Sequence, residues 1–231
     1  MRVAVVTVGD ELLSGETVNT NAAWLGQQLA ARGVTVERVT TIPDRLADIA
    51  RVVNEYHAEY DAVVVTGGLG PTHDDVTIDG VAAAFGRRVV ESEEALAWLE
   101  ENGGYTRDDL TEGTGDVPEG ARVLPNHEGV APGCVVENCY VLPGVPAEMK
   151  RMFEVVADDF AGESRYVATV NTAEPESALL DRLAEVQERF PVKVGSYPGD
   201  NVRIRFEGGD EAVVEEAAAW LEDRVERPDA Q

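Results

Sequence analysis

Strand-like and helix-like segments alternate along the first 85 residues of this 231-residue chain, and this order constrains the fold more than any other feature. The strand-like runs are short, apolar and rich in valine, and a helical pattern follows each of them. The predicted strands are 2–8, 34–40 and 61–66, and the predicted helices are 21–32, 43–56 and 76–85. Apolar strands in this order predict a parallel sheet that is covered by helices on both faces.

The remaining residues add one more strand and a second, smaller unit. A predicted strand over 134–142 precedes a helix that ends near residue 160. From residue 165 the order becomes strand, helix, strand, strand, helix, which is similar to a truncated ferredoxin-like fold. We therefore predict an α/β fold, with a three-layer parallel-sheet domain over 1–163 and a small α+β (ferredoxin-like) domain over 164–231.

The composition is strongly acidic. The chain has 44 Asp and Glu residues against 19 Lys and Arg residues, which gives a net charge of −25. Nucleic-acid binding needs a basic face, so no nucleic-acid partner is expected. The acidic residues are spread along the chain and lysine is scarce, which is typical of a salt-adapted (halophilic) protein; a merely acidic protein is the alternative. No apolar run is long enough to span a membrane and the N-terminus does not resemble a signal peptide, so we expect a cytoplasmic protein without a membrane partner.

Two cysteines, Cys134 and Cys139, fall within the predicted strand 134–142. A separation of five positions in one strand places two side chains on opposite faces, so these cysteines are not expected to form a disulfide. Two cysteines alone do not make a zinc site. Free thiols without a chemical role are therefore predicted.

The segment TGGLGPTHDDVT, residues 66–77, is the most informative motif for function. It joins a predicted strand to a predicted helix through a glycine-rich turn, an arrangement that presents backbone N–H groups to an anion. The same turn carries Asp74 and Asp75 and has no lysine, so a bound phosphate would be repelled unless a divalent cation lay beside it. The motif therefore predicts a metal-assisted phosphate or pyrophosphate site.

The topology brings a second loop to this site. Because the crossovers are right-handed, the loops after the first and third strands emerge from the same carboxyl edge of the sheet. Asp10 and Glu11 lie in the first of these loops. Either carboxylate could orient or deprotonate a metal-bound water, or contact a ribose.

These considerations define three groups of candidate residues. The catalytic candidates are Asp10, Glu11 and Asp75, and the metal ligands are Asp74 and Asp75. The candidates for binding substrate all lie in loops that follow predicted strands or at the starts of predicted helices. They are Gly67, Gly68, Gly70, Pro71, Thr72, Thr77, Asn19, Asn21, Gly144, Pro146 and Glu148. Each group has a structural alternative. Asp, Thr and Asn residues also cap helices, with Thr20 or Asn21 expected to cap helix 21–32, and glycines also serve turns with positive φ.

Three separated motifs carry a family resemblance. GDELLSGETVNTN at 9–21, GGLGPTHDDVT at 67–77 and LPGVPAEMK at 142–150 together resemble the CinA (competence/damage-inducible protein) family. The segment GSYP at 195–198 resembles the small second domain of that family. The resemblance implies a molybdopterin-binding-like first domain, shared with molybdenum-cofactor biosynthesis proteins. It also implies a short archaeal-type form without the C-terminal amidohydrolase domain.

Two activities follow from this resemblance as expectations. The first is metal-dependent hydrolysis of the pyrophosphate of ADP-ribose or a related nucleotide, with Mg, Mn or Co as the divalent metal. The alternative is a molybdopterin-binding protein of molybdenum-cofactor biosynthesis, with molybdopterin as the ligand. Either implies a small-molecule nucleotide or pterin partner, and the resemblance implies a homo-oligomer, either a dimer or a trimer.

The chain departs from the family pattern at two places. Family members usually carry a lysine shortly before the proline at Pro118, where this chain has the sequence GTGD at 113–116. Val130 stands where a threonine is expected. A cation that binds phosphate is therefore expected to be missing or to come from elsewhere.

Overall fold

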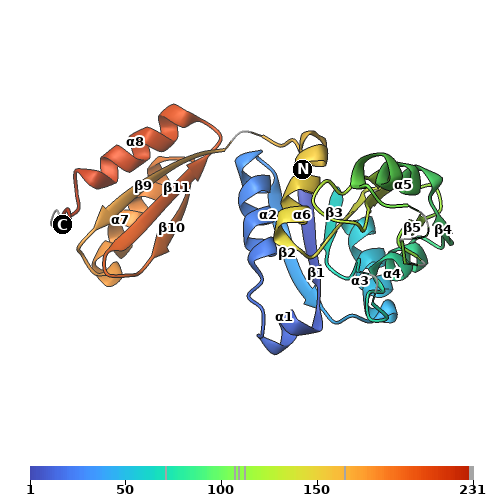
Figure 1. Cartoon of the computed structure of the whole chain (residues 1–231). Coiled ribbons are helices and arrows are strands. Elements are labelled where there is room, and N and C mark those ends of the chain that lie inside the picture. Colours follow the sequence, from blue (N-terminus) through green and yellow to red (C-terminus); the bar gives the residue numbers. More distant parts are fainter. Residues whose placement is uncertain (71, 107, 109, 112, 164, 229–231) are drawn as a thin grey trace. The chain divides into compact units, whose positions relative to one another are not determined.

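The structure, a computed structural model, describes residues 1–228 except 71, 107, 109, 112 and 164. The chain divides into two compact units, Met1–Gly162 and Glu163–Gln231 (Figure 1). Each unit has its own hydrophobic core. Within the described part of the chain, no helix combines the length and the apolar character that a membrane span requires.

The first unit is built on a six-stranded sheet in the order β2-β1-β3-β8-β7-β6. Its strands are β1 (Arg2–Val8), β2 (Thr35–Ile42), β3 (Ala62–Thr66), β6 (Arg122–Leu124), β7 (Gly133–Val136) and β8 (Cys139–Leu142). The first four strands in that order are parallel, while β7 and β6 pair antiparallel. The predicted α/β fold with a largely parallel sheet is therefore confirmed, with an antiparallel edge that the strand pattern did not indicate.

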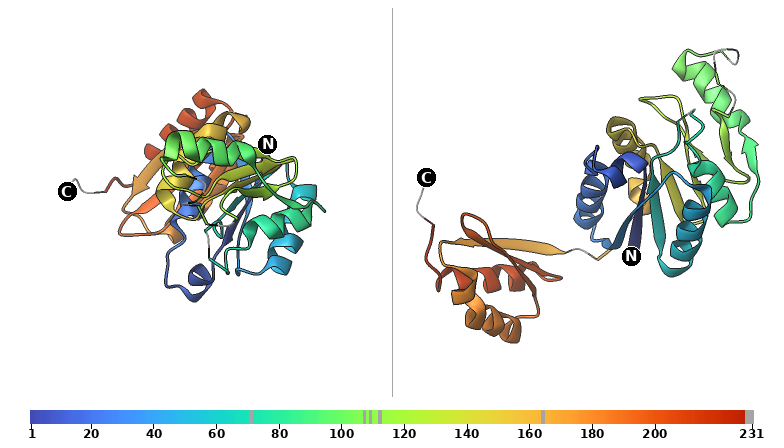
Figure 2. Two further views of the ribbon diagram at one scale, coloured as in Figure 1. Left: turned by 45° about the vertical axis from the view of Figure 1, so that its right-hand side comes forward. Right: turned by 90° about the horizontal axis from the view of Figure 1, so that it is seen from below.

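Helices cover both faces of this sheet, so the predicted three layers are present (Figure 1, Figure 2). Helices α2 (Thr20–Ala31) and α6 (Pro146–Val156) pack on one face, and α3 (Leu46–Glu59) and α4 (Thr77–Ala84) pack on the other. Side chains of β1 alternate between the layers, since Val5 faces α2 and Val6 faces α3. This double burial explains why the strand is apolar throughout.

The predicted single strand over 134–142 is wrong, because the chain reverses at Glu137 and Asn138 to form the β7–β8 hairpin. Glu137 has a φ of 51° at this turn. Both cysteines consequently lie in the same core on neighbouring strands, rather than on opposite faces of one strand. Both thiols are free, as predicted. Burial raises the pKa of the Cys134 thiol to about 12, so this thiol is not a nucleophile at neutral pH.

Several short elements complete the first unit, and of these the sequence predicts only a short strand at 89–90 and a helix from Ser92 to about Asn102. The loop over 9–20 contains α1 (Asp10–Ser14). A separate two-stranded antiparallel sheet pairs β4 (Val89–Glu91) with β5 (Asp116–Pro118), and α5 (Glu93–Trp98) continues into the π-helix η1 (Leu99–Gly103). Helix α6 is followed by the 3-10 turn η3 (Ala157–Asp159). Three-residue strands and single helical turns are too short to produce a periodic pattern.

The second unit has the strand and helix order that the sequence predicts. It consists of β9 (Tyr166–Thr172), α7 (Glu176–Arg189), β10 (Lys193–Tyr197), β11 (Val202–Gly208) and α8 (Glu211–Glu222). The three strands form an antiparallel sheet in the order β10-β11-β9. Alternate residues of β11, such as Ile204 and Phe206, are fully buried and pack with Leu179 and Leu221 of the two helices.

Candidate functional site

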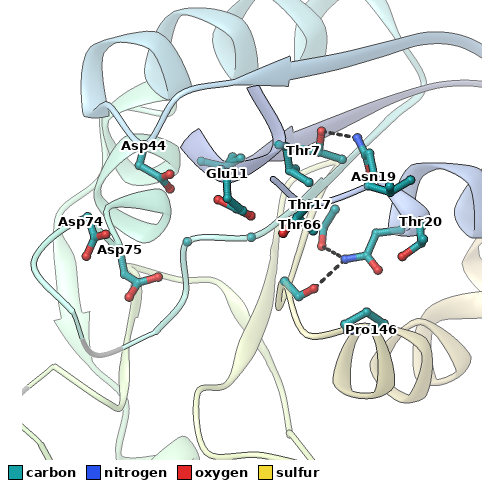
Figure 3. Close-up of a pocket in the computed structure, with 18 residues that line it drawn as sticks. Thr7, Glu11, Thr17, Asn19, Thr20, Asp44, Thr66, Asp74, Asp75 and Pro146 are labelled. Carbon is teal, nitrogen blue, oxygen red and sulfur yellow. Dashed lines mark hydrogen bonds between the residues drawn. The ribbon is translucent and has the colours of Figure 1, made fainter. Parts of the chain in front are cut away.

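A cavity of about 240 Å³ lies at the carboxyl edge of the sheet in the first unit. It is formed by the ends of β1 and β3, the start of α2 and the turn that follows β8 (Figure 3). Among the predicted site residues, those that line it are Glu11, Asn19, Asn21, Gly67, Gly68, Asp74, Asp75, Gly144 and Pro146. The loops after the first and third strands therefore meet at one edge of the sheet, as the topology predicts.

The floor of the cavity is the glycine turn after β3. Gly67 and Gly68 have φ values of 105° and 65°, which disfavour any residue with a side chain. A Cβ on Gly67 would lie 2.2 Å from the carbonyl oxygen of Val8, so glycine is also needed for close packing on β1. Within the described part of the chain, the backbone N–H groups of Gly68, Leu69 and Gly70 donate no hydrogen bond. Gly68 lines this cavity, whereas Leu69 and Gly70 line a neighbouring one, and free donors in such a turn fit an anion.

Two asparagines also line the cavity. Asn19, rather than Thr20 or Asn21, caps α2 by accepting a hydrogen bond from the backbone N–H of Ala22 at 3.0 Å. The Asn19 amide also donates to the hydroxyl of Thr7 at 2.9 Å. Asn21 donates to the carbonyl oxygen of Gly144 at 2.7 Å, while its own Oδ1 is buried without a partner in the described structure. Asn21 itself is part of the cavity lining.

Four carboxylates face the cavity, and one of them was missed by sequence reasoning. Asp44 follows β2 and was predicted only to open a helix, but it lines the cavity beside Glu11 and Asp74 (Figure 3). Burial raises the pKa of Asp44, the backbone N–H of Asp10 lowers it through a 2.8 Å hydrogen bond, and the neighbouring acidic groups raise it further. Its position at the end of β2, at the same carboxyl edge, was the signal that could have identified it.

Asp75 has a structural partner as well as a place in the cavity wall. Its Oδ2 accepts hydrogen bonds from the backbone N–H of Thr72, at 3.0 Å, and from the Thr72 hydroxyl. The Asp75 N–H in turn donates to the Thr72 carbonyl at 3.0 Å. The carboxylate thus closes the turn over residues 72–75, and it does not cap α4, which begins at Thr77 without a side-chain cap.

The other predicted site residues lie elsewhere. Asp10 contributes its backbone N–H to Asp44, and its side chain is not part of the lining. Thr77 is fully buried, with its hydroxyl unpartnered in the described structure and packed against Gly68. Gly70 and Thr72 line a neighbouring cavity. The Glu148 carboxylate accepts a 2.7 Å hydrogen bond from Asn126 and lines neither cavity. Pro71 lies outside the described residues.

Whether a divalent cation fits this cavity depends on whether its ligands come from the protein alone or also from a bound substrate. Among the described residues, no three carboxylate, imidazole or thiol groups are gathered closely enough to hold a metal ion. A cation held by the protein alone therefore does not fit this arrangement. Mg²⁺ is commonly bound through one or two carboxylates together with the phosphates of a substrate, and that mode suits the carboxylates that surround this cavity.

Comparisons with known proteins point to one family. Residues 4–162 match the family model described as "Probable molybdopterin binding domain", and residues 164–229 match "FAD synthase, middle domain". A protein of Archaeoglobus fulgidus is 39% identical over 225 residues, which is 96% of this chain and 97% of that protein. A CinA-like protein of Citrifermentans bemidjiense is 37% identical and is covered over 58% of its length, with 97% of this chain aligned.

A solved structure supports the same assignment. The crystal structure of the CinA protein with unknown function from Thermoplasma acidophilum is similar, with a TM-score of 0.64 and 36% sequence identity. The match covers 70% of this chain and 99% of that one. The likeness therefore extends over most of this chain.

Proposed function

The chain belongs to the CinA family and its first unit to the molybdopterin-binding domain family, and from this premise we propose that the cavity at Gly68 binds a phosphorylated pterin of the molybdopterin class. The phosphate would lie on the free N–H groups of the glycine turn. This turn is the observation on which the proposal rests, because its backbone donors lack acceptors and Gly68 lines the cavity, which suits an anion.

The side chains around the turn fit such a ligand. Asn21, Thr17 and Thr20 line the cavity with amide and hydroxyl side chains. The carboxylates of Glu11 and Asp74 would repel a bare phosphate. When Mg²⁺ accompanies the ligand it neutralises this repulsion, with those two carboxylates as the groups that would hold it.

A titration with a pterin monophosphate, followed by pterin fluorescence with and without Mg²⁺, tests the proposal. A Cβ at Gly68 would lie 2.3 Å from the Thr77 hydroxyl, at a residue with positive φ. Gly68→Ala should therefore distort the turn and weaken binding at least tenfold. Gly26→Ala is the matched control, since a Cβ there meets no atom within 4 Å. Equal affinity for both variants would contradict a phosphate on this turn.

A second candidate function is hydrolysis of the pyrophosphate of ADP-ribose or a related nucleotide. The four carboxylates that line the cavity, those of Glu11, Asp44, Asp74 and Asp75, are the observation that favours it, because such groups can take a proton from water. The oxygen of water would form a bond to one phosphorus while the bond from that phosphorus to the bridging oxygen breaks. AMP and a sugar phosphate would leave, and the proton lost by water would pass to the Glu11 carboxylate.

Release of AMP from ADP-ribose in molar KCl, with Mg²⁺, Mn²⁺ or Co²⁺, tests this second candidate. Glu11→Gln should reduce the rate about a hundredfold or more if this carboxylate acts as the general base. Glu16→Gln, in the same exposed loop but outside the lining, is the control. If the folded protein binds a pterin but releases no AMP from ADP-ribose, the hydrolase function is excluded and the pterin-binding function is retained.

Self-association is a further part of this proposal. The family resemblance favours a homo-oligomer, either a dimer or a trimer. Sedimentation equilibrium in molar KCl distinguishes these states from a monomer of 24.9 kDa.

A further inference from the structure

A second cavity, of about 410 Å³, adjoins the first within the same unit. Gly68 and Asp75 line both cavities, so the two share the glycine turn as a common wall. A ligand whose phosphate lies on that turn can therefore extend into either space. Placing a ligand in the second cavity rests on the proposed function, because it requires a phosphorylated ligand that binds at the turn.

The second cavity has the apolar surfaces that a flat ring needs. Its lining includes the side chains of Leu69, Ile78, Val89, Tyr105 and Pro132. The Tyr105 side chain is 37% exposed, so its ring is available for stacking on a ligand. Sites for heterocycles typically combine such surfaces with a few polar groups that fix the orientation.

The charge of this cavity excludes a second phosphate. Among the described residues that line it there is no lysine, arginine or histidine, while Asp75, Asp79 and Asp116 each present a carboxylate. The Asp75 carboxylate is hydrogen-bonded to Thr72, whereas those of Asp79 and Asp116 have no hydrogen bond or ion pair within the described part of the chain. Acceptors without partners, next to apolar walls, suit a neutral ring that carries N–H donors.

The pattern of donors on the ring can be specified further. A carboxylate has two oxygens and accepts best from two adjacent N–H groups. The ring of a pterin presents this pair on one edge, through its N3–H and its 2-amino group, and guanine presents the same pair. Adenine presents one amino donor next to a ring nitrogen that is an acceptor, which a carboxylate oxygen repels. Of the two aspartates without partners, Asp116 is the better placed, because it is half-buried whereas Asp79 is exposed.

We propose that the second cavity holds the aminopyrimidinone ring of the ligand, with the Asp116 carboxylate accepting from its donor–donor edge and Tyr105 covering its face. The first cavity and the glycine turn then hold the phosphate end. Asp116 is thus a specificity-determining residue that selects pterin-like or guanine-like rings over adenine.

Isothermal titration with GMP, IMP and AMP in Mg²⁺ tests this arrangement, since the three share a phosphate and a ribose and differ in the edge of the base. The wild-type protein should bind GMP at least tenfold more tightly than AMP, with IMP between them because it lacks the amino group. Asp116→Asn should weaken GMP at least tenfold and leave AMP unchanged. Asp108→Asn, an exposed aspartate that does not line the cavity, is the control for charge.

The outcomes separate this inference from the proposed function. If the wild-type protein binds the three nucleotides with equal affinity and Gly68→Ala binds none of them, the inference is overturned. A phosphate site at the turn would still be supported. An Asp116→Asn variant that is folded by circular dichroism but weakens GMP and AMP equally would also overturn it. Failure of the wild-type protein to bind any of the three nucleotides or a pterin monophosphate would overturn both.

Discussion

The side-chain amide of Asn21 donates a 2.7 Å hydrogen bond to the backbone carbonyl of Gly144, although 123 positions separate the two residues. The bond joins the start of α2 to the turn after β8. Thr66, at the end of β3, is tied to the same turn, because its hydroxyl donates to the Pro143 carbonyl at 2.6 Å. Three distant segments thus form one wall of the first cavity through a few polar contacts.

Asn21→Ala should lower both ligand affinity and stability. It removes the bond to Gly144 and a polar side chain that lines the cavity, so we expect a loss of about 1 kcal/mol in the free energy of unfolding and a clear loss of affinity for a pterin monophosphate. Asn54→Ala is a matched control, because Asn54 also donates to a carbonyl, that of Ala84 at 3.0 Å, outside the cavity. Urea unfolding and fluorescence titration measure the two effects. If both variants retain full affinity, Asn21 does not contact the ligand.

Gly67→Ala should be strongly destabilising. The new Cβ would lie 2.2 Å from the carbonyl oxygen of Val8, and the backbone φ of 105° is one that alanine rarely adopts. Because the neighbouring atom is backbone and cannot move alone, we expect a loss of about 2 kcal/mol or more. Thermal unfolding compared with Gly26→Ala, in the open face of α2, measures the difference. A melting temperature equal to that of Gly26→Ala would show that the turn has more freedom than its packing indicates.

Thr77→Val should stabilise the protein without changing ligand affinity. The Thr77 side chain is fully buried, its hydroxyl has no partner in the described structure, and it lines neither cavity. Replacing the hydroxyl by a methyl group removes an unsatisfied polar atom, for which we expect a gain of about 1 kcal/mol. A loss of affinity in this variant would restore the sequence-based hypothesis that Thr77 donates to a phosphate.

The sequence predicts most of the fold because the features that determine it are local. In the first unit, each strand is a short apolar run and each helix has apolar residues at helical spacing. The bounds of β1, β3 and α2 were therefore predicted to within a residue or two. The β7–β8 hairpin was missed because its turn, Glu137-Asn138, interrupts an otherwise continuous apolar run without glycine or proline.

The residues that form the site were harder to predict from the sequence than the fold. Asp44 lacks a motif and reaches the cavity only through the parallel pairing of β2 with β1. Conversely, Glu148 belongs to a recognisable motif, but its position on α6 directs it to Asn126. The positions at which the chain departs from the family pattern, 113–116 and Val130, fall largely on the second cavity, which no local pattern could show.

Glu207→Gln should reduce the stability of the second unit in a pH-dependent manner. Burial raises the pKa of the Glu207 carboxyl, but hydrogen bonds from Arg165 and Arg205 outweigh it, so the net pKa is lowered from 4.5. A lowered pKa in the folded state means that the ionised group stabilises the fold above pH 4.5, and that this contribution is lost as the pH falls through the lowered value. The difference between variant and wild type should therefore be present at pH 7 and shrink below pH 4.5.

Hydrogen exchange of the amides in β9 and β11 measures this effect within the second unit. Asp181→Asn on α7 is the control, as an exposed acidic residue for which no arginine contact is formed in the described structure. The Glu207 side chain is only 14% exposed, so its pairs with two arginines should matter more than an ordinary surface ion pair. A difference that stays constant from pH 7 to pH 4 would exclude this electrostatic origin.

Salt should stabilise the whole chain. The net charge of −25 creates self-repulsion in the folded state, and ions in solution screen it. We expect the free energy of unfolding to rise between 0.1 M and 2 M KCl. Neutralising two exposed acidic residues of α7, with Asp181→Asn and Glu188→Gln, should raise stability at low salt by about 0.5 kcal/mol or less. The gain should disappear at high salt, where the repulsion is already screened. A gain of equal size at both salt concentrations would assign it to helix propensity rather than to charge.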